Sequence, residues 1–418
     1  MTEMGEIPEY WEVELMENIA QRQSGHTPDK KVDKYWNGDI PWISLKDTKY
    51  LDNGYIKETT DYTTEEGIKN SSAVILPKGT VILSRDATVG KVGITVKEMA
   101  TSQHFINYIC GEKLHNLYLY YDFLNRKSLF EGIAIGSTIK TIGLPFFKSL
   151  KIVLPPIKEQ QKIALILSNI DDQIENTDNL IEKTKELKKG LMRSLLTKGI
   201  GHDRFKNTEV GMIPEEWEIK TLEECFIFQN GKAFYTEGYS NKGKKVIDLM
   251  NISTEGIFQE LKNKQKYISN ELYNKFQEYQ LNKDDLIMAM SDMSSKLWII
   301  GRTAIVPADK EYVLNQRIGR LICKSNVYVK FANYITNSDY FLSQIRKNAK
   351  GTAQFYVNTG DITSSVIALP SLEEQKWIAS ILSSVDEKIC QYKLQKVKLI
   401  ELKKGLMQKL LLGIIRVK

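Results

Sequence analysis

The chain has 418 residues, of which 42% are hydrophobic and 10% aromatic, so it is too long for one compact core and too apolar for wholesale disorder. Its 58 Lys and Arg against 52 Asp and Glu give a formal net charge of +6. This mild basic bias permits an acidic partner such as nucleic acid but does not require one, and the length indicates about two to three domains.

The cysteine and hydropathy patterns predict a cytoplasmic protein with no membrane partner. The opening residues MTEMGEIPEYWE contain no basic segment followed by an apolar run, so we expect no signal peptide. No apolar stretch approaches the roughly 20 residues that cross a bilayer. The cysteines are far apart and form no C-x-x-C pair, which indicates neither a disulfide framework nor a zinc site at Cys110, Cys225, Cys323 and Cys390.

The first recognisable element is a block that recurs in the second half of the chain. GEIPEYWEVELMENIAQRQSG begins at Gly5 and matches GMIPEEWEIKTLEECFIFQNG, which begins at Gly211. A weaker pair follows, in which TSQHFINYIC (101–110) matches LNQRIGRLIC (314–323). The offsets, 211 − 5 = 206 and 314 − 101 = 213, differ, so loops of unequal length separate the blocks.

Apolar runs bounded by turn residues predict a strand-rich domain in each half. VILPKGTVILSR (74–85) and VGKVGITV (89–96) predict strands in the first half. NKDDLIMAMS (282–291) and IIGRTAIV (299–306) occur in the same order in the second. Aromatic residues at helical spacing predict helices at 117–130 and 328–347. Each domain is expected to be α/β, with a twisted or barrel-like sheet.

Each half ends in a long segment with the pattern of a coiled-coil helix. Residues 154–200 align with 369–415 without a gap, and 22 of the 47 aligned positions are identical. Apolar residues, Leu187 and Leu402 among them, recur every three or four positions, which predicts helices roughly 60 Å long that start after the preceding prolines. Gly190 and Gly405 interrupt the pattern and predict a local break or a close approach of two helices.

These correspondences predict a tandem duplication. A period of about 200 residues is a domain duplication and not a solenoid repeat. The expected fold is two strand-rich α/β domains separated by two long antiparallel coiled-coil helices, with an approximate two-fold axis between the halves. The expected domains are residues 1–153, the central helix 154–200, residues 201–368 and the C-terminal helix 369–418.

The motifs that would support catalysis are missing from the sequence. Gly238, Gly243 and Lys244 have the spacing of a phosphate-binding loop, but Lys245 replaces the Ser or Thr that binds magnesium. LPPI at Leu154 has no leading Asn or Asp to bind a target amino group, and no G-x-G-x-x-G opens a helix after a strand. PDKK at Pro28 lacks the acidic strand of a nuclease signature. No metal-binding spacing joins His26, His104, His115 and His202.

Features that suit nucleic acid are better represented. Basic residues interleave with aromatics and amides in segments 30–50 and 346–361, where they could contact phosphates and base edges. The polar loops GSTIKTI (136–142) and GTAQFYV (351–357) fall at matching positions of the two halves. The candidate DNA-binding residues are Lys46, Lys49, Arg85, Lys91, Gln103, His104, Lys140, Lys232, Arg302, Gln316, Arg317, Lys350 and Gln354.

The chain resembles the specificity subunit of a type I restriction–modification system, and the resemblance covers essentially its whole length. It is carried by GEIPEYWE and GMIPEEWE at the start of the halves, YWNGDIPWIS (35–44), the doubled pattern E-Q-x-x-I-A-x-I-L-S and the two LKKGLM endings. The sequence departs from the family pattern in one place: the second half offers only KKVIDLMNIS (244–253) as a counterpart of YWNGDIPWIS. The sequence therefore does not decide whether the second domain has the same early strand.

The resemblance implies the following expectations. Each domain is a target recognition domain that reads one half of a bipartite target in double-stranded DNA, and the helices set the gap and dock two methyltransferase subunits. Translocase–nuclease subunits join in a restricting system. The chain itself is not catalytic and binds no cofactor or metal. S-adenosylmethionine, ATP and magnesium are expected on the partner subunits.

Two other classes of protein are weighed against this interpretation. A catalytic chain, either a fused methyltransferase–specificity protein or a stand-alone nuclease, would need motifs that the sequence lacks. A coiled-coil scaffold with incidental domains would select no sequence from a random duplex library, whereas a specificity subunit would.

Overall fold

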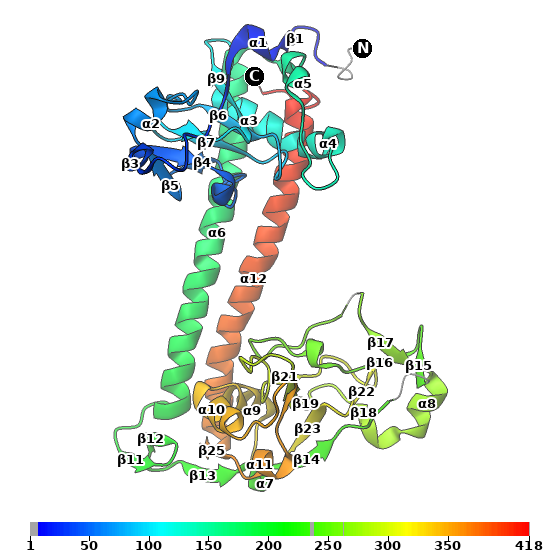
Figure 1. Ribbon diagram of the computed structural model, residues 1–418. Helices are drawn as coiled ribbons and strands as arrows, with labels where there is room; N and C mark the ends of the chain where they lie inside the picture. The colour runs from blue at the N-terminus through cyan, green and yellow to red at the C-terminus, as the bar shows by residue number, and fades with distance from the viewer. Residues whose placement is uncertain (1–6, 235–237, 262, 418) are drawn as a thin grey trace. The chain divides into compact units, whose positions relative to one another are not determined.

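The computed structural model describes residues 7–234, 238–261 and 263–417, and the chain divides into two compact units. Unit 1 comprises Met1–Asn179 and Lys393–Lys418, and unit 2 comprises Leu180–Tyr392. Gly5 and Glu6, which begin the first repeated block, lie outside the described residues. The long helices α6 (Ile157–Lys198) and α12 (Leu372–Leu411) each contribute one end to each unit (Figure 1).

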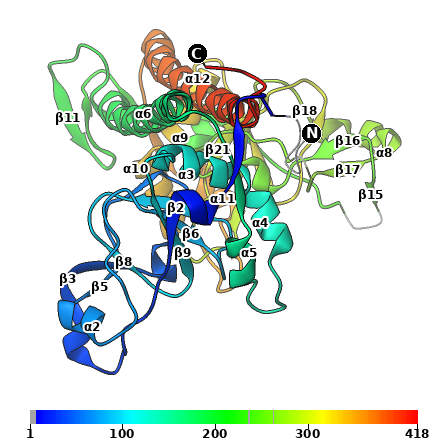
Figure 2. The same cartoon turned by 90° about the horizontal axis from the view of Figure 1, so that it is seen from above.

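Unit 1 is built on a five-stranded sheet with the strand order β2-β9-β6-β7-β4. A smaller sheet has the order β5-β3-β8, and Figure 2 shows β3, β5 and α2 grouped away from α4 and α5. The elements are β1 (Glu12–Leu15), α1 (Met16–Ile19), β2 (Ala20–Ser24), β3 (Trp36–Ile43), β4 (Tyr55–Ile56), β5 (Asp61–Thr63), α2 (Glu65–Lys69), β6 (Val81–Ser84), β7 (Val92–Thr95), β8 (Ala100–Thr101), β9 (Phe105–Cys110), α3 (Asn116–Asn125), α4 (Lys127–Ile133), α5 (Leu144–Lys148), β10 (Lys151–Leu154) and α6 (Ile157–Lys198).

The core of unit 1 lies between this sheet and the aromatic helices. Every residue of β6 and β7 is buried, as the apolar runs in the sequence predict. Tyr108 of β9 packs edge-to-face on Phe123 of α3, and Phe123 packs in turn on Phe130 of α4. The predicted helix over 117–130 is therefore two helices that share one aromatic cluster.

Unit 2 repeats this plan with a second, separate sheet. Its four-stranded sheet has the order β14-β23-β19-β21, which corresponds to β2-β9-β6-β7, and a five-stranded sheet has the order β15-β17-β16-β22-β18. The elements are β11 (Phe205–Thr208), β12 (Gly211–Pro214), β13 (Glu218–Thr221), α7 (Leu222–Cys225), β14 (Phe226–Asn230), β15 (Tyr239–Ser240), β16 (Lys244–Val246), β17 (Lys266–Ile268), α8 (Asn270–Lys275), β18 (Gln280–Leu281), β19 (Leu286–Ala289), β20 (Ser291–Asp292), β21 (Thr303–Ile305), β22 (Tyr312–Val313), β23 (Ile318–Cys323), α9 (Val329–Thr336), α10 (Asp339–Lys347), β24 (Phe355–Tyr356), α11 (Thr359–Thr363), β25 (Val366–Leu369) and α12 (Leu372–Leu411).

The sequence did not decide whether the second half has an early strand like that of the first. The structure shows that it does. β3 pairs in parallel with β8 and leads into a helical turn whose Asp47 carboxylate accepts a hydrogen bond from the Ser44 N–H. β16 pairs in parallel with β22 and leads into a turn whose Asn251 side chain accepts from the Asp248 N–H. The strand KKV (244–246) therefore takes the place of the end of β3, with Asp248 at the position of Ser44, so KKVIDLMNIS overlaps the counterpart of YWNGDIPWIS only in its first five residues.

The two long helices run antiparallel. In unit 1, Asp171 of α6 pairs with Lys403 of α12 at 2.5 Å, and Asp178 pairs with Lys396 at 2.6 Å. The residue numbers therefore rise along α6 where they fall along α12. Both helices are continuous, with 42 residues in α6 and 40 in α12. A helix of this length measures about 60 Å.

Two expectations about these helices are wrong. Helix α6 continues through Gly190 and α12 through Gly405, and a Cβ added at either glycine would meet no atom within 4 Å, so neither a break nor a close helix approach occurs there. Leu187 and Leu402, assigned to the apolar stripe, are 56% and 50% exposed.

The physical reason for the exposed leucines is a lysine that takes the inward position beside each of them. Lys188 pairs with Asp386 at 2.6 Å in unit 2, and the equivalent Lys403 pairs with Asp171 in unit 1. Both lysine side chains are only 16% exposed. Each ammonium also lies 5.4 Å from the ring centre of a tyrosine that donates a hydrogen bond to the same aspartate, Tyr334 in unit 2 and Tyr121 in unit 1.

Each long helix begins with a buried glutamate that binds the tryptophan of the repeated opening block. In unit 1, Trp11 Nε1 donates to Glu159 Oε2 at 3.1 Å, and Arg416 donates to both carboxylate oxygens at 2.7 and 2.8 Å. In unit 2, Trp217 Nε1 donates to Glu374 Oε2 at 3.0 Å, and His202 Nε2 lies 3.0 Å from Glu374 Oε1. The two most similar sequence blocks of each half are therefore joined in space.

The architecture is thus two strand-rich α/β domains with two long antiparallel helices, arranged as a tandem duplication. Across the described residues, no helix is both long and apolar enough to cross a membrane. The four cysteines are free. No group of three or more His, Cys, Asp and Glu side chains could hold a metal ion within residues 7–234, 238–261 and 263–417.

Candidate nucleic-acid interface

A tight hairpin marks the same place in both units. In unit 1, Ile135 and Thr141 exchange main-chain hydrogen bonds of 3.0 and 2.9 Å around the loop GSTIK, and in unit 2 Lys350 and Tyr356 exchange two bonds of 2.9 Å around GTAQF. Gly136 and Gly351 begin these loops with φ of 139° and 122°, a conformation that favours glycine. The loops that match in sequence therefore match in geometry, and we call them hairpin 1 (135–141) and hairpin 2 (350–356).

Main-chain hydrogen bonds bring each hairpin against a polar turn distant in sequence. In unit 1, the Arg85 N–H donates to the His104 carbonyl at 2.9 Å, and the Arg85 carbonyl accepts from Ile142 at 2.8 Å. In unit 2, Met290 makes the equivalent bonds to Arg317 and Val357, each at 3.0 Å.

The same bonds bring several predicted site residues together. In unit 1 they are Arg85, Gln103, His104 and Lys140, and in unit 2 they are Gln316, Arg317, Lys350 and Gln354.

Lysine side chains surround a pocket of about 510 Å³ beside hairpin 1. Lys91, Lys127 and Lys140 line it together with Thr138 and other residues. The Lys91 ammonium donates to the Thr48 carbonyl at 2.9 Å, and Lys127 pairs with Asp52 at 2.6 Å. The Lys140 carbonyl accepts from the Ala87 N–H at 3.1 Å, but its ammonium has no hydrogen bond or ion pair to another described residue, so its charge is available to an anionic partner.

The turn beside hairpin 1 carries a histidine held by a carboxylate. His104 Nδ1 lies 2.6 Å from Asp86 Oδ1, and the side chains are 31% and 14% exposed. Because the carboxylate engages Nδ1, Nε2 is the ring nitrogen left for another partner. The neighbouring Gln103 carboxamide oxygen accepts a hydrogen bond from the Thr27 hydroxyl.

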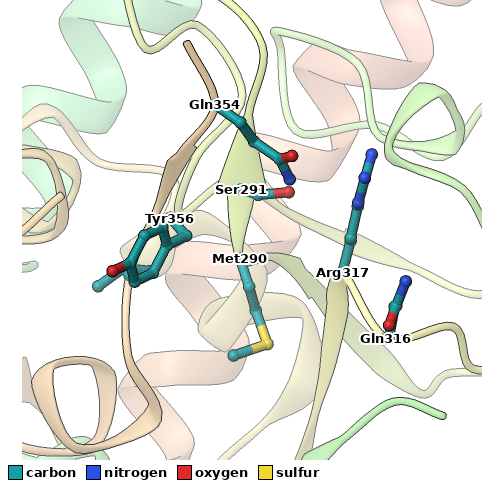
Figure 3. Close-up of a pocket in the computed structure, with 7 residues that line it drawn as sticks. Met290, Ser291, Gln316, Arg317, Gln354 and Tyr356 are labelled. Carbon is teal, nitrogen blue, oxygen red and sulfur yellow. The ribbon is translucent and has the colours of Figure 1, made fainter. Parts of the chain in front are cut away.

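The corresponding place in unit 2 is a pocket of about 330 Å³ with different chemistry (Figure 3). Arg317 replaces the histidine, and Ser291 stands where unit 1 has Asp86. No carboxylate pairs with Arg317 within the part of the chain that the structure describes. The pocket is lined by Met290, Ser291, Gln316, Arg317, Gln354, Tyr356 and Val357.

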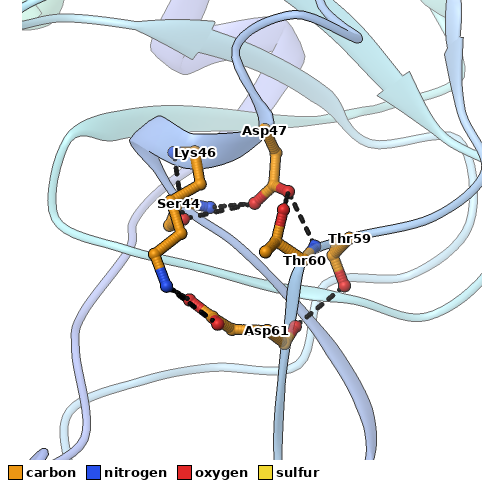
Figure 4. A network of polar contacts seen from close by, with 6 residues as sticks. All are labelled: Ser44, Lys46, Asp47, Thr59, Thr60 and Asp61. Atoms are coloured by element: carbon orange, nitrogen blue, oxygen red, sulfur yellow. Dashed lines mark hydrogen bonds and ion pairs between the residues drawn. The ribbon is translucent and has the colours of Figure 1, made fainter.

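Two lysines of segment 30–50, Lys46 and Lys49, lie at a turn fixed by a buried carboxylate, and Figure 4 shows Lys46 there. Asp47 is 1% exposed and accepts hydrogen bonds from the Thr60 N–H at 2.7 Å and the Thr60 hydroxyl at 2.6 Å, as well as from Ser44. Lys46 pairs with Asp61 at 3.0 Å, and the Lys49 ammonium lies 4.8 Å from the ring centre of Tyr50. Since Lys91 bonds to Thr48, this turn adjoins the lysine pocket.

Two of the remaining candidates, Lys232 and Lys350, lie beside the pocket of unit 2. The Lys232 ammonium lies 4.4 Å from the ring centre of Phe276, and its main chain bridges to Asn315, beside Gln316. Lys350 pairs with Asp361 at 3.5 Å and is 58% exposed.

Arg302 is directed elsewhere. It donates to the Asn337 carbonyl at 3.2 Å, and burial, together with the charge of Arg346, lowers the pKa of its guanidinium. The structure does not bring Arg302 to the pocket of unit 2.

Sequence reasoning missed Asp86, Lys127, Ser291 and a loop next to Ser291. Asp86 and Ser291 each follow a buried strand by two residues, a position that the aligned strands could have revealed. The loop is an insertion of the second half, where Asp292 accepts from the N–H groups of Ser294 and Ile299 at 2.8 and 2.7 Å. It presents Met293 and Trp298, which are 64% and 53% exposed.

These arrangements suit recognition and not catalysis. Donor-rich side chains on rigid turns can bind phosphates and base edges. The loop at Gly238–Lys245 is no phosphate site, because Lys244 donates to the Lys310 carbonyl at 2.7 Å and Lys245 pairs with Glu260 at 3.1 Å.

Comparison with known proteins identifies the family. The family described as type I restriction modification DNA specificity domain matches residues 8–186 and 214–401. The MjaVIII type I restriction enzyme specificity subunit of Methanocaldococcus jannaschii is 32% identical over 416 residues, which cover 99% of this chain and 94% of that protein. The MjaIX specificity subunit of the same organism is 30% identical, covering 100% and 96%.

Solved structures share the fold at low sequence identity. The S subunit of the type I restriction–modification system from M. genitalium covers 98% of this chain and 99% of its own, with a TM-score of 0.56 at 16% identity. A chain from a study of complex assembly in the type I system has a TM-score of 0.61 at 13% identity, covering 98% and 100%. The chain belongs to the type I restriction–modification DNA specificity family, whose members supply sequence specificity to the complex and leave its catalysis to other subunits.

Proposed function

We propose that this chain reads a bipartite, asymmetric sequence in double-stranded DNA, with residues 1–153 and 201–368 as its two target recognition domains. Each domain would read one half of the target. The supporting observation is that the two units repeat one main-chain framework and differ in the side chains mounted on it.

The framework pairs unlike residues at equivalent positions. Arg85 corresponds to Met290, and His104 corresponds to Arg317, because each pair makes the same main-chain hydrogen bonds. In the hairpins, Lys140 corresponds to Phe355, since the neighbouring Thr141 and Tyr356 occupy the same bridge. Base edges are distinguished by their hydrogen-bond donors and acceptors, so unlike side chains on one framework suit two unlike half-sites.

The lysines around the hairpins suit a second role. Lys46, Lys49, Lys91, Lys140, Lys232 and Lys350 carry ammonium groups that can neutralise phosphates and position the duplex without reading sequence. The exposed Met293 and Trp298 of unit 2 offer apolar contact to a groove wall or a base step. Gln103 and Gln316 flank the reading turns and belong to the same contact surface.

The long helices are the proposed spacer and the docking place of the partners. Residues 154–200 and 369–418 would set the number of base pairs between the half-sites and bind two methyltransferase subunits. Apolar side chains left exposed on a helix mark protein contacts. On these helices the most exposed apolar residues include Leu165 at 59%, Leu187 at 56%, Trp377 at 54% and Leu394 at 55%.

In this assembly the chemistry belongs to the partners. The methyltransferase subunits would bind S-adenosylmethionine and methylate adenine, and translocase–nuclease subunits, in a restricting system, would use ATP and magnesium. The chain would work in the cytoplasm, where chromosomal DNA of a prokaryotic cell lies.

Methylome sequencing of cells that express this chain with its modification subunits tests the proposal. We expect one methylated motif with two unlike halves separated by a fixed gap. A random duplex library incubated with the purified complex should enrich the same motif. A uniform library after selection, or a motif without a gap, would refute the proposal.

A further inference from the structure

The pocket of unit 2 contains a buried polar group without a partner. Ser291 is 3% exposed, and its hydroxyl oxygen has no hydrogen-bond partner within the described chain. A buried hydroxyl in this state is costly unless a ligand group or a water completes it. Figure 3 shows the Ser291 hydroxyl, the Gln354 carboxamide and the Arg317 guanidinium around one open space.

The second observation concerns charge. Arg317 is an exposed guanidinium, and neither a carboxylate nor a hydrogen-bond acceptor holds it among the described residues. Its main chain is fixed, because its carbonyl accepts from the Met290 N–H and the next residue begins β23. A guanidinium is a planar fork that only donates hydrogen bonds, so it suits a partner that presents two adjacent acceptors.

In the major groove of DNA, guanine presents such a pair at N7 and O6, whereas adenine pairs an acceptor with a donor. We propose that Arg317 reads a guanine in the half-site bound by residues 201–368, donating to its N7 and O6. The Ser291 hydroxyl and the Gln354 carboxamide lie beside it and can accept from the N4 amino group of the paired cytosine. This inference rests on the proposed function and assigns a base to one of its contacts.

Unit 1 cannot make the same contact at the equivalent place. His104 is a single ring held by Asp86, so it presents one nitrogen and not a fork. The negative charge of Asp86, which Ser291 replaces in unit 2, also disfavours two acceptors of a guanine edge. The guanine contact is therefore specific to the half-site of unit 2.

The test compares Arg317→Lys and Arg317→Ala in the full chain assembled with its modification subunits. The lysine variant keeps the charge and loses the fork. We expect both variants to lose about tenfold to a hundredfold of their preference for guanine at one position, because a bidentate pair contributes about 1–3 kcal/mol of discrimination. The other half-site should be read as before. Lys283→Ala removes an exposed charge at the opposite end of β19 and should leave every base preference intact.

A chemical probe identifies the acceptor. A duplex with 7-deazaguanine at that position lacks N7, so it should bind the parent complex about tenfold more weakly and the Arg317→Ala complex no more weakly than unmodified DNA. If Arg317 contacts a phosphate, Arg317→Lys keeps its base preferences and Arg317→Ala weakens all sequences alike, with a smaller salt dependence. That result overturns this inference and leaves the proposed function standing, whereas a parent complex without any sequence preference overturns both.

Discussion

One buried glutamine connects each long helix to the domain that precedes it. Gln160 Nε2 donates to the carbonyls of Pro155 and Lys113 at 2.8 and 2.9 Å, and its Oε1 accepts from the His115 N–H at 2.9 Å. Gln375 makes the three equivalent bonds in unit 2. Both side chains are fully buried, so each satisfies main-chain groups that no water reaches.

Replacing Gln160 by methionine should therefore destabilise unit 1. The change keeps the side-chain volume but leaves buried carbonyl and N–H groups unpaired, which costs about 2–4 kcal/mol. Urea denaturation of the full chain, followed by circular dichroism, measures the loss as an earlier first transition. The adjacent Gln161 is exposed, and Gln161→Met should leave the transition within about 0.5 kcal/mol. Equal effects of the two substitutions would contradict the role assigned to Gln160.

The same residues show what the sequence could predict. The doubled E-Q pattern indicates that the two helix starts are equivalent, but it does not reveal their partners. Trp11 lies 148 residues before Glu159, and the Arg416 guanidinium that completes this cluster lies 257 residues after it. Contacts over such separations depend on the path of the whole chain, which periodicity does not encode.

At the scale of elements, the helices were predicted more fully than the candidate site. Apolar spacing and the prolines predict α6 to within a few residues, whereas α12 ends at Leu411, seven residues before the expected end at 418. The sequence did not predict that Lys188 and Lys403 point inward, because a lysine in an apolar pattern is normally solvent-exposed. Their partners, Asp386 and Asp171, lie on the other helix and far away in the sequence. The matching hairpin loops were also recognised, but their contact with the turns at His104 and Arg317 was not.

The antiparallel register allows a sharp test of the spacer. A heptad inserted after Asn179 and another after Leu394, the equivalent position, would keep the Asp178–Lys396 and Lys188–Asp386 pairs together within their units. Seven residues add about 10.5 Å and nearly two full turns, so we expect the gap in the methylated motif to grow by roughly three base pairs with both halves unchanged.

An insertion in α6 alone is the control for this experiment. It shifts α6 past α12 by about 10 Å, so one of the two sets of ion pairs must separate. We expect the single insertion to lower methylation of any motif, measured by methylome sequencing of the same cells. An unchanged gap in the double insertion would contradict the role of the helices as a spacer.

At the scale of the whole molecule, the repeated contacts show how one chain can carry two specificities. The framework groups recur in both units: the buried glutamate and glutamine, the tyrosine–aspartate–lysine cluster and the glycine of each hairpin. The groups that differ, such as His104 with Asp86 and Arg317 with Ser291, lie on surfaces that the framework does not need. Recognition can therefore diverge between the halves without loss of the fold.

The exchange of one domain tests this claim most directly. Residues 1–153 are replaced by the corresponding domain of another specificity subunit, and the methylome is sequenced in cells that also express the modification subunits. We predict that one half of the methylated motif changes, while the other half and the gap stay as they were. A change in both halves, or in neither, would contradict the account.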